Sequence, residues 1–216
     1  MRTHLFLFGG GPPFTPNLRT RFATLTNDGP VAILYVPRTG KDWTSYSSIY
    51  TKPLEEDGIS SFVHLPLSDA PTDEQLAQLQ QCQGIIISGG ETELYQQYLV
   101  ATPIGDIIQS RFADGVPVAG FSAGALVSPE RCVIPEIDQR DNRRLRLPGL
   151  ALLKDAVVCV HYETWGEAAH LTQSFAEEGT NRAFGLADES GIYLRDQYLV
   201  ETEGTDPVVL SRSPVR

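Results

Sequence analysis

The sequence predicts an α/β domain built on a largely parallel β-sheet. Short apolar runs rich in branched residues alternate along the chain with stretches of helical period, and this alternation is typical of that class. Several of the runs are nearly continuous in apolar residues, as expected for strands that are buried on both faces. With 216 residues, the chain has the length of one domain with a single sizeable core. We therefore expect one domain over residues 1–216.

Six strands are predicted in the first three quarters of the chain. The first, Thr3–Phe8, runs directly into three glycines, and the fourth, Gly84–Ser88, contains three consecutive isoleucines. Branched apolar residues of this kind favour strands, and glycines after them favour turns. The other predicted strands are Val31–Val36, Ser61–Leu65, Val116–Phe121 and Ala156–Val160.

Amphipathic helices are predicted between these strands. Leu18, Phe22 and Leu25 recur at i, i+4 and i+7, which predicts a helix over Asn17–Thr26. The sequence from Thr72 to Gln75 forms a capping box that opens a second helix. The further helical patterns cover Leu94–Leu99, Ile104–Phe112 with a stop signal at Asp114-Gly115, and Glu167–Ala176.

The regular alternation weakens in the second half of the chain. Residues 128–150 contain three prolines, many charges and little periodicity, so we expect an irregular stretch or a short hairpin there. The last part of the chain predicts short strands, with a hairpin turn at Asp196-Gln197. These strands are Phe184–Ala187, Ile192–Leu194, Tyr198–Glu201 and Val208–Leu210.

The charge of the chain excludes one class of partner. Its 17 Lys and Arg residues oppose 27 Asp and Glu residues, which gives a net charge of −10. The basic residues are scattered, whereas a surface that binds nucleic acid normally carries a basic patch. No apolar run approaches the ~18 residues of a membrane span, and Leu5–Phe8 is too short for a signal-peptide core. We expect a cytoplasmic protein without nucleic-acid or membrane partners.

The three cysteines do not form a recognisable metal or disulfide pattern. Cys82, Cys132 and Cys159 are odd in number, widely spaced and lack a CxxC pair. We expect buried free thiols, and neither a disulfide framework nor a zinc site.

A Gly-x-Ser-x-Gly motif carries the strongest chemical information. The segment from Gly120 to Gly124 follows a predicted strand, and the small residues at its end begin a predicted helix. A serine in that setting sits on a strained turn with its hydroxyl at the carboxyl edge of the sheet. The N–H of Ala123 then points toward an oxyanion that forms beside Ser122. The alternative is a glycine-rich helix start with Ser122 as its cap.

A second glycine turn follows the isoleucine strand. Ser88-Gly89-Gly90 ends this strand, and Glu91-Thr92 opens the next helix. In a parallel sheet this turn lies at the same carboxyl edge, where ligands bind. The N–H of Gly90 is the natural second donor to an oxyanion, although a plain strand-to-helix turn is the alternative.

A serine nucleophile needs a base, and His161 is the best placed of the four histidines. It directly follows the apolar strand Ala156–Val160, so it also stands at the carboxyl end of a strand. His4 and His64 lie in or near early strands, and His170 falls in a predicted helix, where a surface position is expected.

Spacing does not choose the carboxylate that would orient His161. Glu163 shares a strand-like face with the histidine. The other candidates are Glu136 and Asp138, in the irregular stretch, and Asp188 and Glu189, after the predicted strand at Phe184.

Together these motifs resemble peptidase family S51, which contains aspartyl dipeptidase (peptidase E) and cyanophycinase. The resemblance rests on Ser88–Thr92, Gly120–Ala125, His161 and Gly185–Asp188, and extends from Leu7 to about Leu194. It implies a three-layer α/β/α sandwich with a mostly parallel sheet, a flavodoxin-like fold related to that of class I glutamine amidotransferases. It also implies a homodimer.

The family resemblance implies a role for each matching position. The nucleophile falls on Ser122, the base on His161, and the oxyanion donors on the backbone of Gly90 and Ala123. The triad acid falls on Asp188, where peptidase E has a glutamate, and another acidic position of the family matches Glu136; we rank Glu163 third. The implied reaction is acyl transfer to water, with no metal and no organic cofactor.

The segment after His161 argues against strict specificity for aspartyl dipeptides. By the family resemblance, members with that specificity have a longer loop after the base histidine, with an arginine near its end. Here the corresponding segment, residues 162–169, is short and has alanine in that place. Glu91 and Thr92 are predicted to bind substrate, with Glu91 pairing with the free amine of a peptide; the equal alternative is that Glu91 is a first-turn glutamate favoured by the helix macrodipole. This favours dipeptidase or aminopeptidase action on small peptides that have neutral or basic side chains.

Two other classes of function remain open. One is a different hydrolase activity on the same fold, such as isopeptide cleavage of the cyanophycinase type or ester hydrolysis. The other is a binding domain that keeps the strand-turn-helix around Ser122, the nucleophile elbow, only as a structural feature.

Trp43, Tyr46 and Tyr50, in residues 41–51, are expected to be exposed in a dimer contact, a loop over the site or an inert surface loop.

Overall fold

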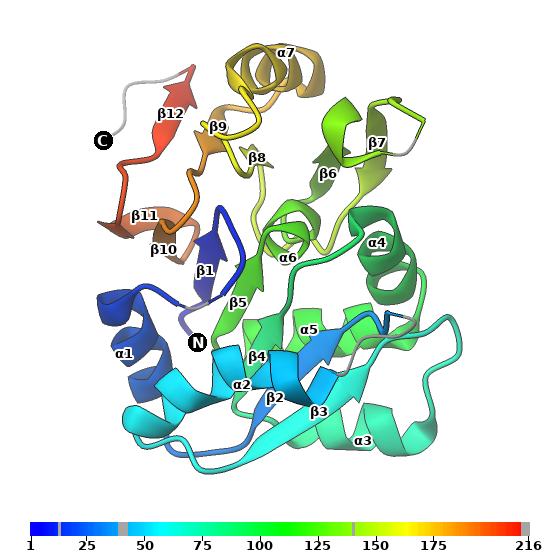
Figure 1. Cartoon of the computed structure of the whole chain (residues 1–216), viewed down its shortest axis with the longest axis vertical. Helices are drawn as coiled ribbons and strands as arrows, with labels where there is room; N and C mark the ends of the chain where they lie inside the picture. Colours follow the sequence, from blue (N-terminus) through cyan, green and yellow to red (C-terminus); the bar gives the residue numbers. More distant parts are fainter. Residues whose placement is uncertain (13, 39–42, 140, 213–216) are drawn as a thin grey trace.

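A computed structural model describes residues 1–12, 14–38, 43–139 and 141–212 of the chain. Its centre is a seven-stranded sheet with the order β11-β10-β1-β5-β4-β2-β3 (Figure 1). The five strands from β1 to β3 in this order pair in parallel, and β10 and β11 add an antiparallel edge. The strands are β1 (His4–Phe8), β2 (Val31–Tyr35), β3 (Phe62–Pro66), β4 (Gly84–Ile87), β5 (Val118–Phe121), β10 (Gly191–Arg195) and β11 (Tyr198–Glu203).

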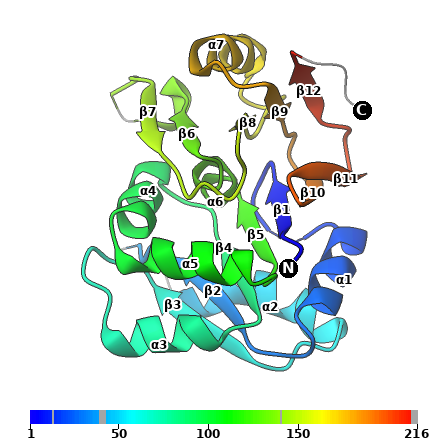
Figure 2. The ribbon, with the colours of Figure 1, turned by 180° about the vertical axis from the view of Figure 1, so that it is seen from behind.

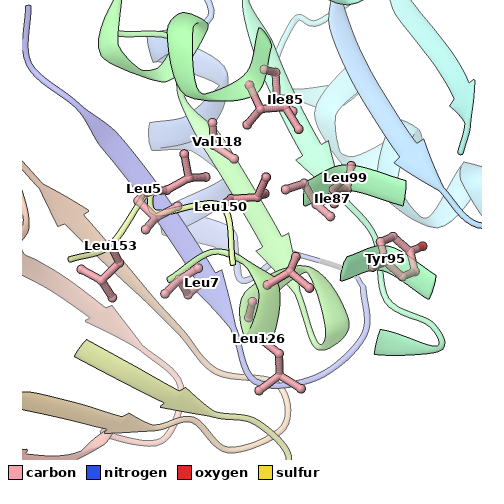
Figure 3. Packing of buried hydrophobic residues seen from close by; sticks show 14 of the residues in the cluster. Leu5, Leu7, Ile85, Ile87, Tyr95, Leu99, Val118, Leu126, Leu150 and Leu153 are labelled. Atoms are coloured by element: carbon pink, nitrogen blue, oxygen red, sulfur yellow. The ribbon is translucent and has the colours of Figure 1, made fainter. Parts of the chain in front are cut away.

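Helices cover both faces of this sheet, which confirms the predicted α/β sandwich. Alternate strand residues point to opposite faces, so Phe6 and Ile86 lie in one apolar cluster and Leu5 and Ile85 in another. α1 (Pro16–Leu25) and α2 (Trp43–Glu56) contribute to the first cluster. The second is completed by α3 (Asp73–Gln81), α4 (Thr92–Val100), α5 (Pro103–Ala113) and α6 (Ala123–Val127), which Figure 2 labels. Figure 3 shows Leu99 of α4 and Leu126 of α6 among the residues of this cluster.

The strand that precedes His161 lies outside the main sheet, contrary to the expectation of one sheet. β8 (Ala156–Cys159) forms a three-stranded sheet of order β12-β9-β8 with β9 (Arg182–Gly185) and β12 (Val208–Ser211). β8 packs instead against α7 (Ala168–Glu178), because Val157 and Cys159 form a separate buried apolar cluster with Leu171 of that helix. These elements lie above the main sheet in Figures 1 and 2, at the end toward which β1 points.

The irregular stretch after the elbow contains the short hairpin that was expected. β6 (Arg131–Ile134) and β7 (Leu145–Pro148) pair antiparallel, and the 3₁₀ turn η1 (Glu136–Asp138) lies between them. The turn at Asp196-Gln197 also forms, with φ of 51° and 74°. The predicted strand Phe184–Ala187 instead ends at Gly185, and the chain continues as a loop toward Asp188.

The aromatic segment near residue 43 is a helix rather than an exposed loop. Tyr50 is fully buried in α2, and Trp43 is half-buried with its ring stacked on Tyr35 at 3.7 Å. Serine and threonine residues and an internal proline, Pro53, hide the helical pattern in the sequence. Residues 41 and 42 of this segment lie outside the described part of the chain. Of these aromatics Tyr46 alone is exposed.

No helix in the described part of the chain is both long and apolar enough to cross a lipid bilayer. The three cysteines are buried free thiols, as expected.

Candidate active site

Ser122 occupies a strained turn between β5 and α6. Its φ of 49° and ψ of −107° lie in a region that residues with a side chain rarely adopt. The carbonyl of Ser122 accepts hydrogen bonds from the N–H groups of Ala125 and Leu126, at 2.9 and 3.0 Å, so the helix starts directly after the turn. The strand-turn-helix arrangement predicted from the Gly-x-Ser-x-Gly motif is therefore present.

The two glycines of the motif are required because no side chain fits at either position. A Cβ on Gly120 would lie 2.4 Å from the carbonyl oxygen of Gly124. A Cβ on Gly124 would lie 2.2 Å from the carbonyl oxygen of Ile87. This close backbone packing seats the elbow against the end of β4.

The second glycine turn lies beside Ser122. An ideal Cβ on Gly89 would be 3.5 Å from the Cβ of Ser122. Tyr95 donates its hydroxyl to the carbonyl of Gly89 at 3.2 Å, and the N–H of Gly89 donates to the hydroxyl of Tyr50 at 3.4 Å. Burial raises the pKa of Tyr95 to about 12, so this donor keeps its proton at neutral pH. Two buried tyrosines thus fix the turn that leads to Gly90.

His161 connects Ser122 to a carboxylate. Its Nε2 lies 2.9 Å from the Oγ of Ser122, and its Nδ1 lies 2.5 Å from the Oδ1 of Asp188. The backbone of His161 also has a positive φ, 48°, and the ring of Trp165 packs on the imidazole with a centroid distance of 4.3 Å. Hydroxyl, imidazole and carboxylate therefore form one continuous chain of hydrogen bonds.

The end of β1 joins the two sheets at this point. The carbonyl of Phe8 accepts from the N–H of Ser122 at 3.1 Å, and the carbonyl of Gly9 accepts from the N–H of His161 at 2.8 Å. Because β8 does not pair with the main sheet, these two bonds to neighbouring residues set the histidine against the serine. The turn after β1 also approaches the carboxylate closely. A Cβ on Gly10 would lie 2.6 Å from the Oδ1 of Asp188, so this position requires glycine.

Within the described residues, Asp188 is the carboxylate that contacts His161. Its Oδ2 accepts a hydrogen bond of 2.5 Å from the hydroxyl of Thr164, so both carboxylate oxygens are held. The alternatives Glu136, Glu163 and Glu189 have exposed side chains, and Glu136 lies in η1.

Asp138, another carboxylate that the sequence left open as the acid, contacts Thr92 rather than His161. Asp138, in η1, is half-buried, and its Oδ2 accepts a 2.6 Å hydrogen bond from Thr92. Burial is the largest effect on this group and raises its pKa, while the charge of His161 lowers it. Thr92, predicted to bind substrate, is almost fully buried, so we expect it to act through Asp138. No local signal distinguishes Asp138, because the contact depends on a hairpin that folds back over α4.

A hollow of about 680 Å³ opens beside Gly90. Its lining includes the predicted substrate residue Glu91, which is exposed, and Asp138. Among the described residues, its lining includes Arg38 and four acidic residues, Glu91, Glu93, Asp138 and Asp141, and the last of these is ion-paired with Arg143 at 2.6 Å. Acidic residues therefore outnumber basic ones in the described part of this lining.

The other histidines lie away from Ser122. His4 contacts the hydroxyl of Tyr193 at 2.7 Å, and His64 accepts from the indole of Trp43 at 3.3 Å. His170 is not on the surface as expected: its side chain is 11% exposed, and burial lowers its pKa to about 4. It belongs to a group with Cys159 and Glu167 that could hold a metal ion.

The geometry agrees with what comparison with known proteins finds. Residues 5–206 match the family model described as Peptidase family S51. Among curated proteins, a cyanophycinase of Trichormus variabilis (strain ATCC 29413 / PCC 7937) is 23% identical over 175 residues, which cover 77% of this chain and 59% of that protein. A cyanophycinase of Synechococcus elongatus is 29% identical over 128 residues, which cover 57% of this chain and 39% of that protein. The chain thus spans less than two thirds of the length of these relatives.

A solved structure shares the fold. The crystal structure of a peptidase from an acI-B1 Actinobacterium superposes with a TM-score of 0.69 at 16% sequence identity, covering 99% of this chain and 89% of that one. At this identity the likeness concerns the fold alone.

Proposed function

Because this chain belongs to peptidase family S51, we propose that it is a serine peptidase that hydrolyses short peptides by acyl transfer through Ser122. The observation that carries the proposal is the chain of hydrogen bonds from the hydroxyl of Ser122 through His161 to Asp188. A hydroxyl, an imidazole and a carboxylate in this order are the groups that nucleophilic catalysis by serine requires.

The first step is attack of Ser122 Oγ on the carbonyl carbon of the scissile bond. Nε2 of His161 takes the hydroxyl proton while the new C–O bond forms. Asp188 accepts a hydrogen bond from Nδ1–H and so maintains the tautomer in which Nε2 can accept that proton. Its other oxygen is bound to Thr164, which keeps the carboxylate from rotating away.

The charge that develops on the carbonyl oxygen needs donors, and we assign the N–H groups of Ala123 and Gly90 to this role. Ala123 directly follows the nucleophile and begins α6. Gly90 follows the turn that packs against Ser122. Backbone donors held in this way need no reorganisation during the reaction, which is the main source of their effect on rate.

The second half of the reaction reuses the same groups. Protonated His161 gives its proton to the leaving amine, which departs and leaves an acyl ester on Ser122. Water then attacks the ester carbonyl with His161 again as base, and the carboxylic acid is released while Ser122 regains its proton.

The charge of the hollow beside Gly90 favours a substrate with an amine or a basic group. Among its described lining residues, Glu91, Glu93 and Asp138 are set against one guanidinium, that of Arg38, so an acidic side chain would meet repulsion and an ammonium would be attracted. We therefore propose broad dipeptidase or aminopeptidase action, rather than specificity for aspartyl peptides.

A second candidate is isopeptide cleavage of the cyanophycinase type. It is favoured by the curated relatives, which are cyanophycinases, and by the same acidic hollow. The chemistry at Ser122 would be the same, since an isopeptide is also an amide.

The test combines active-site labelling with a substrate panel. We expect a fluorophosphonate to label the wild-type protein but neither Ser122→Ala nor His161→Ala, because an unactivated hydroxyl does not react. Dipeptides, tripeptides and cyanophycin would then be compared by the appearance of free amine. Ser110→Ala, an exposed serine on α5, serves as the control and should behave as the wild type.

The outcomes separate the alternatives. Undiminished hydrolysis by Ser122→Ala would overturn the proposed nucleophile. Cleavage of cyanophycin without cleavage of the small peptides would select the second candidate. Absence of both labelling and hydrolysis in the wild type would indicate a binding domain.

A further inference from the structure

A compact group of three potential metal ligands lies where β8 packs on α7, next to the segment that carries His161. The Sγ of Cys159, a carboxylate oxygen of Glu167 and a ring nitrogen of His170 lie within 4.8 Å of one another. We call these residues the Cys-Glu-His cluster. Cys159 is the last residue of β8, Glu167 is the N-cap of α7, and His170 lies one turn further on the same helix face. The packing of α7 on β8 therefore brings them together.

Two polar atoms of the cluster are buried without a hydrogen-bond partner in the described structure. These are Oε2 of Glu167 and Nε2 of His170, which lie 3.9 Å apart. The Glu167 side chain is 93% buried, being 7% exposed. Leaving such atoms unpaired costs about 1–3 kcal/mol each, and buried polar atoms normally have a protein, water or ion partner. Their position therefore points to a ligand between them.

The donor set matches the chemistry of zinc. Thiolate, imidazole and carboxylate are its usual protein ligands, with bonds of about 2.0–2.3 Å. Tetrahedral bonds of that length place neighbouring ligand atoms about 3.3–3.6 Å apart. The 3.9 Å between the Glu167 and His170 atoms is close to this value.

We propose that Cys159, Glu167 and His170 bind one Zn²⁺ ion, with water as the fourth ligand. With the thiolate and the carboxylate ionised, the two negative charges balance those of the ion. The nearby cation, Arg144, donates from its two terminal nitrogens to Glu177 and Ser174 at 2.8 Å each, while its Nε is buried without a partner in the described structure. This proposal departs from the sequence prediction of no zinc site, which considered the cysteines alone, whereas two of the three ligands are not cysteines.

The ion would fasten both ends of the segment that carries the proposed base. Cys159 and Glu167 flank residues 160–166. Within that segment, Trp165 N–H donates to the carbonyl of His161 at 2.8 Å, and Glu167 N–H donates to the carbonyl of Tyr162 at 2.9 Å. Zinc at the cluster would therefore hold this segment in place, and its binding can be tested apart from the proposed peptidase activity.

The test is a metal titration of the full chain after removal of metal with a chelator. We expect one equivalent of Co²⁺ to produce thiolate-to-cobalt charge-transfer absorption and the visible bands of a four-coordinate ion, and Zn²⁺ to displace it. Zinc at 100 times its Kd should raise Tm by about 5–10 °C. A wild-type protein that gives no charge-transfer band at saturating Co²⁺ would overturn the proposal, whatever the variants do.

Variants identify the ligands. Cys159→Ser should abolish the charge-transfer band, and His170→Gln should weaken zinc binding at least about 10-fold, as loss of a metal-site partner does. Cys132→Ser and Cys82→Ser change buried cysteines outside the cluster and should keep the band. Circular dichroism checks that each variant is folded. A band that persists in folded Cys159→Ser would place the metal at another thiol and contradict the proposal.

Discussion

Thr164 donates a hydrogen bond of 2.5 Å to the Oδ2 of Asp188, whose Oδ1 lies 2.5 Å from the Nδ1 of His161. Thr164 follows His161 by three residues, so the segment that supplies the histidine also holds the carboxylate that faces it. In this arrangement Asp188 can neither rotate nor withdraw without losing a hydrogen bond. Thr164 is therefore a positioning residue for the proposed mechanism.

Thr164→Val should lower kcat about 10- to 100-fold with little change in KM. The valine keeps the shape but removes a hydrogen bond to a charged group, worth about 1.5–3 kcal/mol. Thr164→Ser should restore most of the rate, which a merely structural role would not require. Thr172→Val, an exposed threonine on α7, is the matched control. A normal kcat for Thr164→Val would show that Asp188 needs no second partner.

Asp188→Asn should lower kcat by about 10²- to 10⁴-fold, because an amide stabilises the wrong tautomer of His161 and cannot balance its positive charge. Glu136→Gln, at the alternative acid with its exposed side chain, should retain nearly full activity. Steady-state kinetics on the best substrate of the panel measures both. The reverse result would assign the acid to Glu136.

Gly10→Ala should reduce kcat about 100-fold, because a Cβ there would lie 2.6 Å from the Oδ1 of Asp188 and displace the carboxylate. A shift of about 1 Å in a catalytic group costs a factor of this size. Gly11→Ala is a closely matched control, since a Cβ at Gly11 meets nothing within 4 Å. Equal activity of the two variants would mean that the loop of Asp188 moves freely.

Asp138→Asn should stabilise the protein at neutral pH and impair substrate binding. Burial raises the pKa of Asp138 above its ordinary 3.8, so the native state binds this proton more tightly than the unfolded chain does. The free energy of unfolding therefore falls as pH rises through that pKa, and a neutral amide escapes this loss. Urea unfolding at pH 7 should favour the variant, and the difference should shrink toward pH 4.

The exposed Asp141, in the same stretch, provides the control. Its pKa is lowered by its hydrogen bond to Arg143, so Asp141→Asn should give no gain at pH 7. In the kinetic assay, KM should rise for Asp138→Asn, because a carboxylate of the hollow is lost. A variant that is no more stable than the wild type at pH 7 would contradict the burial cost.

Features that depend on neighbouring residues were predictable from the sequence. The turn at Ser122 follows from Gly120 and Gly124, because the steric need for glycine is local. The capping box at Thr72 forms as predicted, with Gln75 N–H donating to the Thr72 hydroxyl at 3.2 Å. The apolar runs predicted the strands, since a strand buried on both faces must be apolar along its whole length.

Features that depend on distant segments were decided only by the tertiary structure. The sequence left the acid open among several carboxylates, and the packing of β9 beside β8 brings Asp188, 27 residues away, to His161. The burial of Tyr50 and the contact of Asp138 with Thr92 depend in the same way on helices and hairpins folding over one another. Local sterics and periodicity are properties of contiguous residues, whereas such contacts arise from the balance of packing across the whole core, which no short pattern encodes.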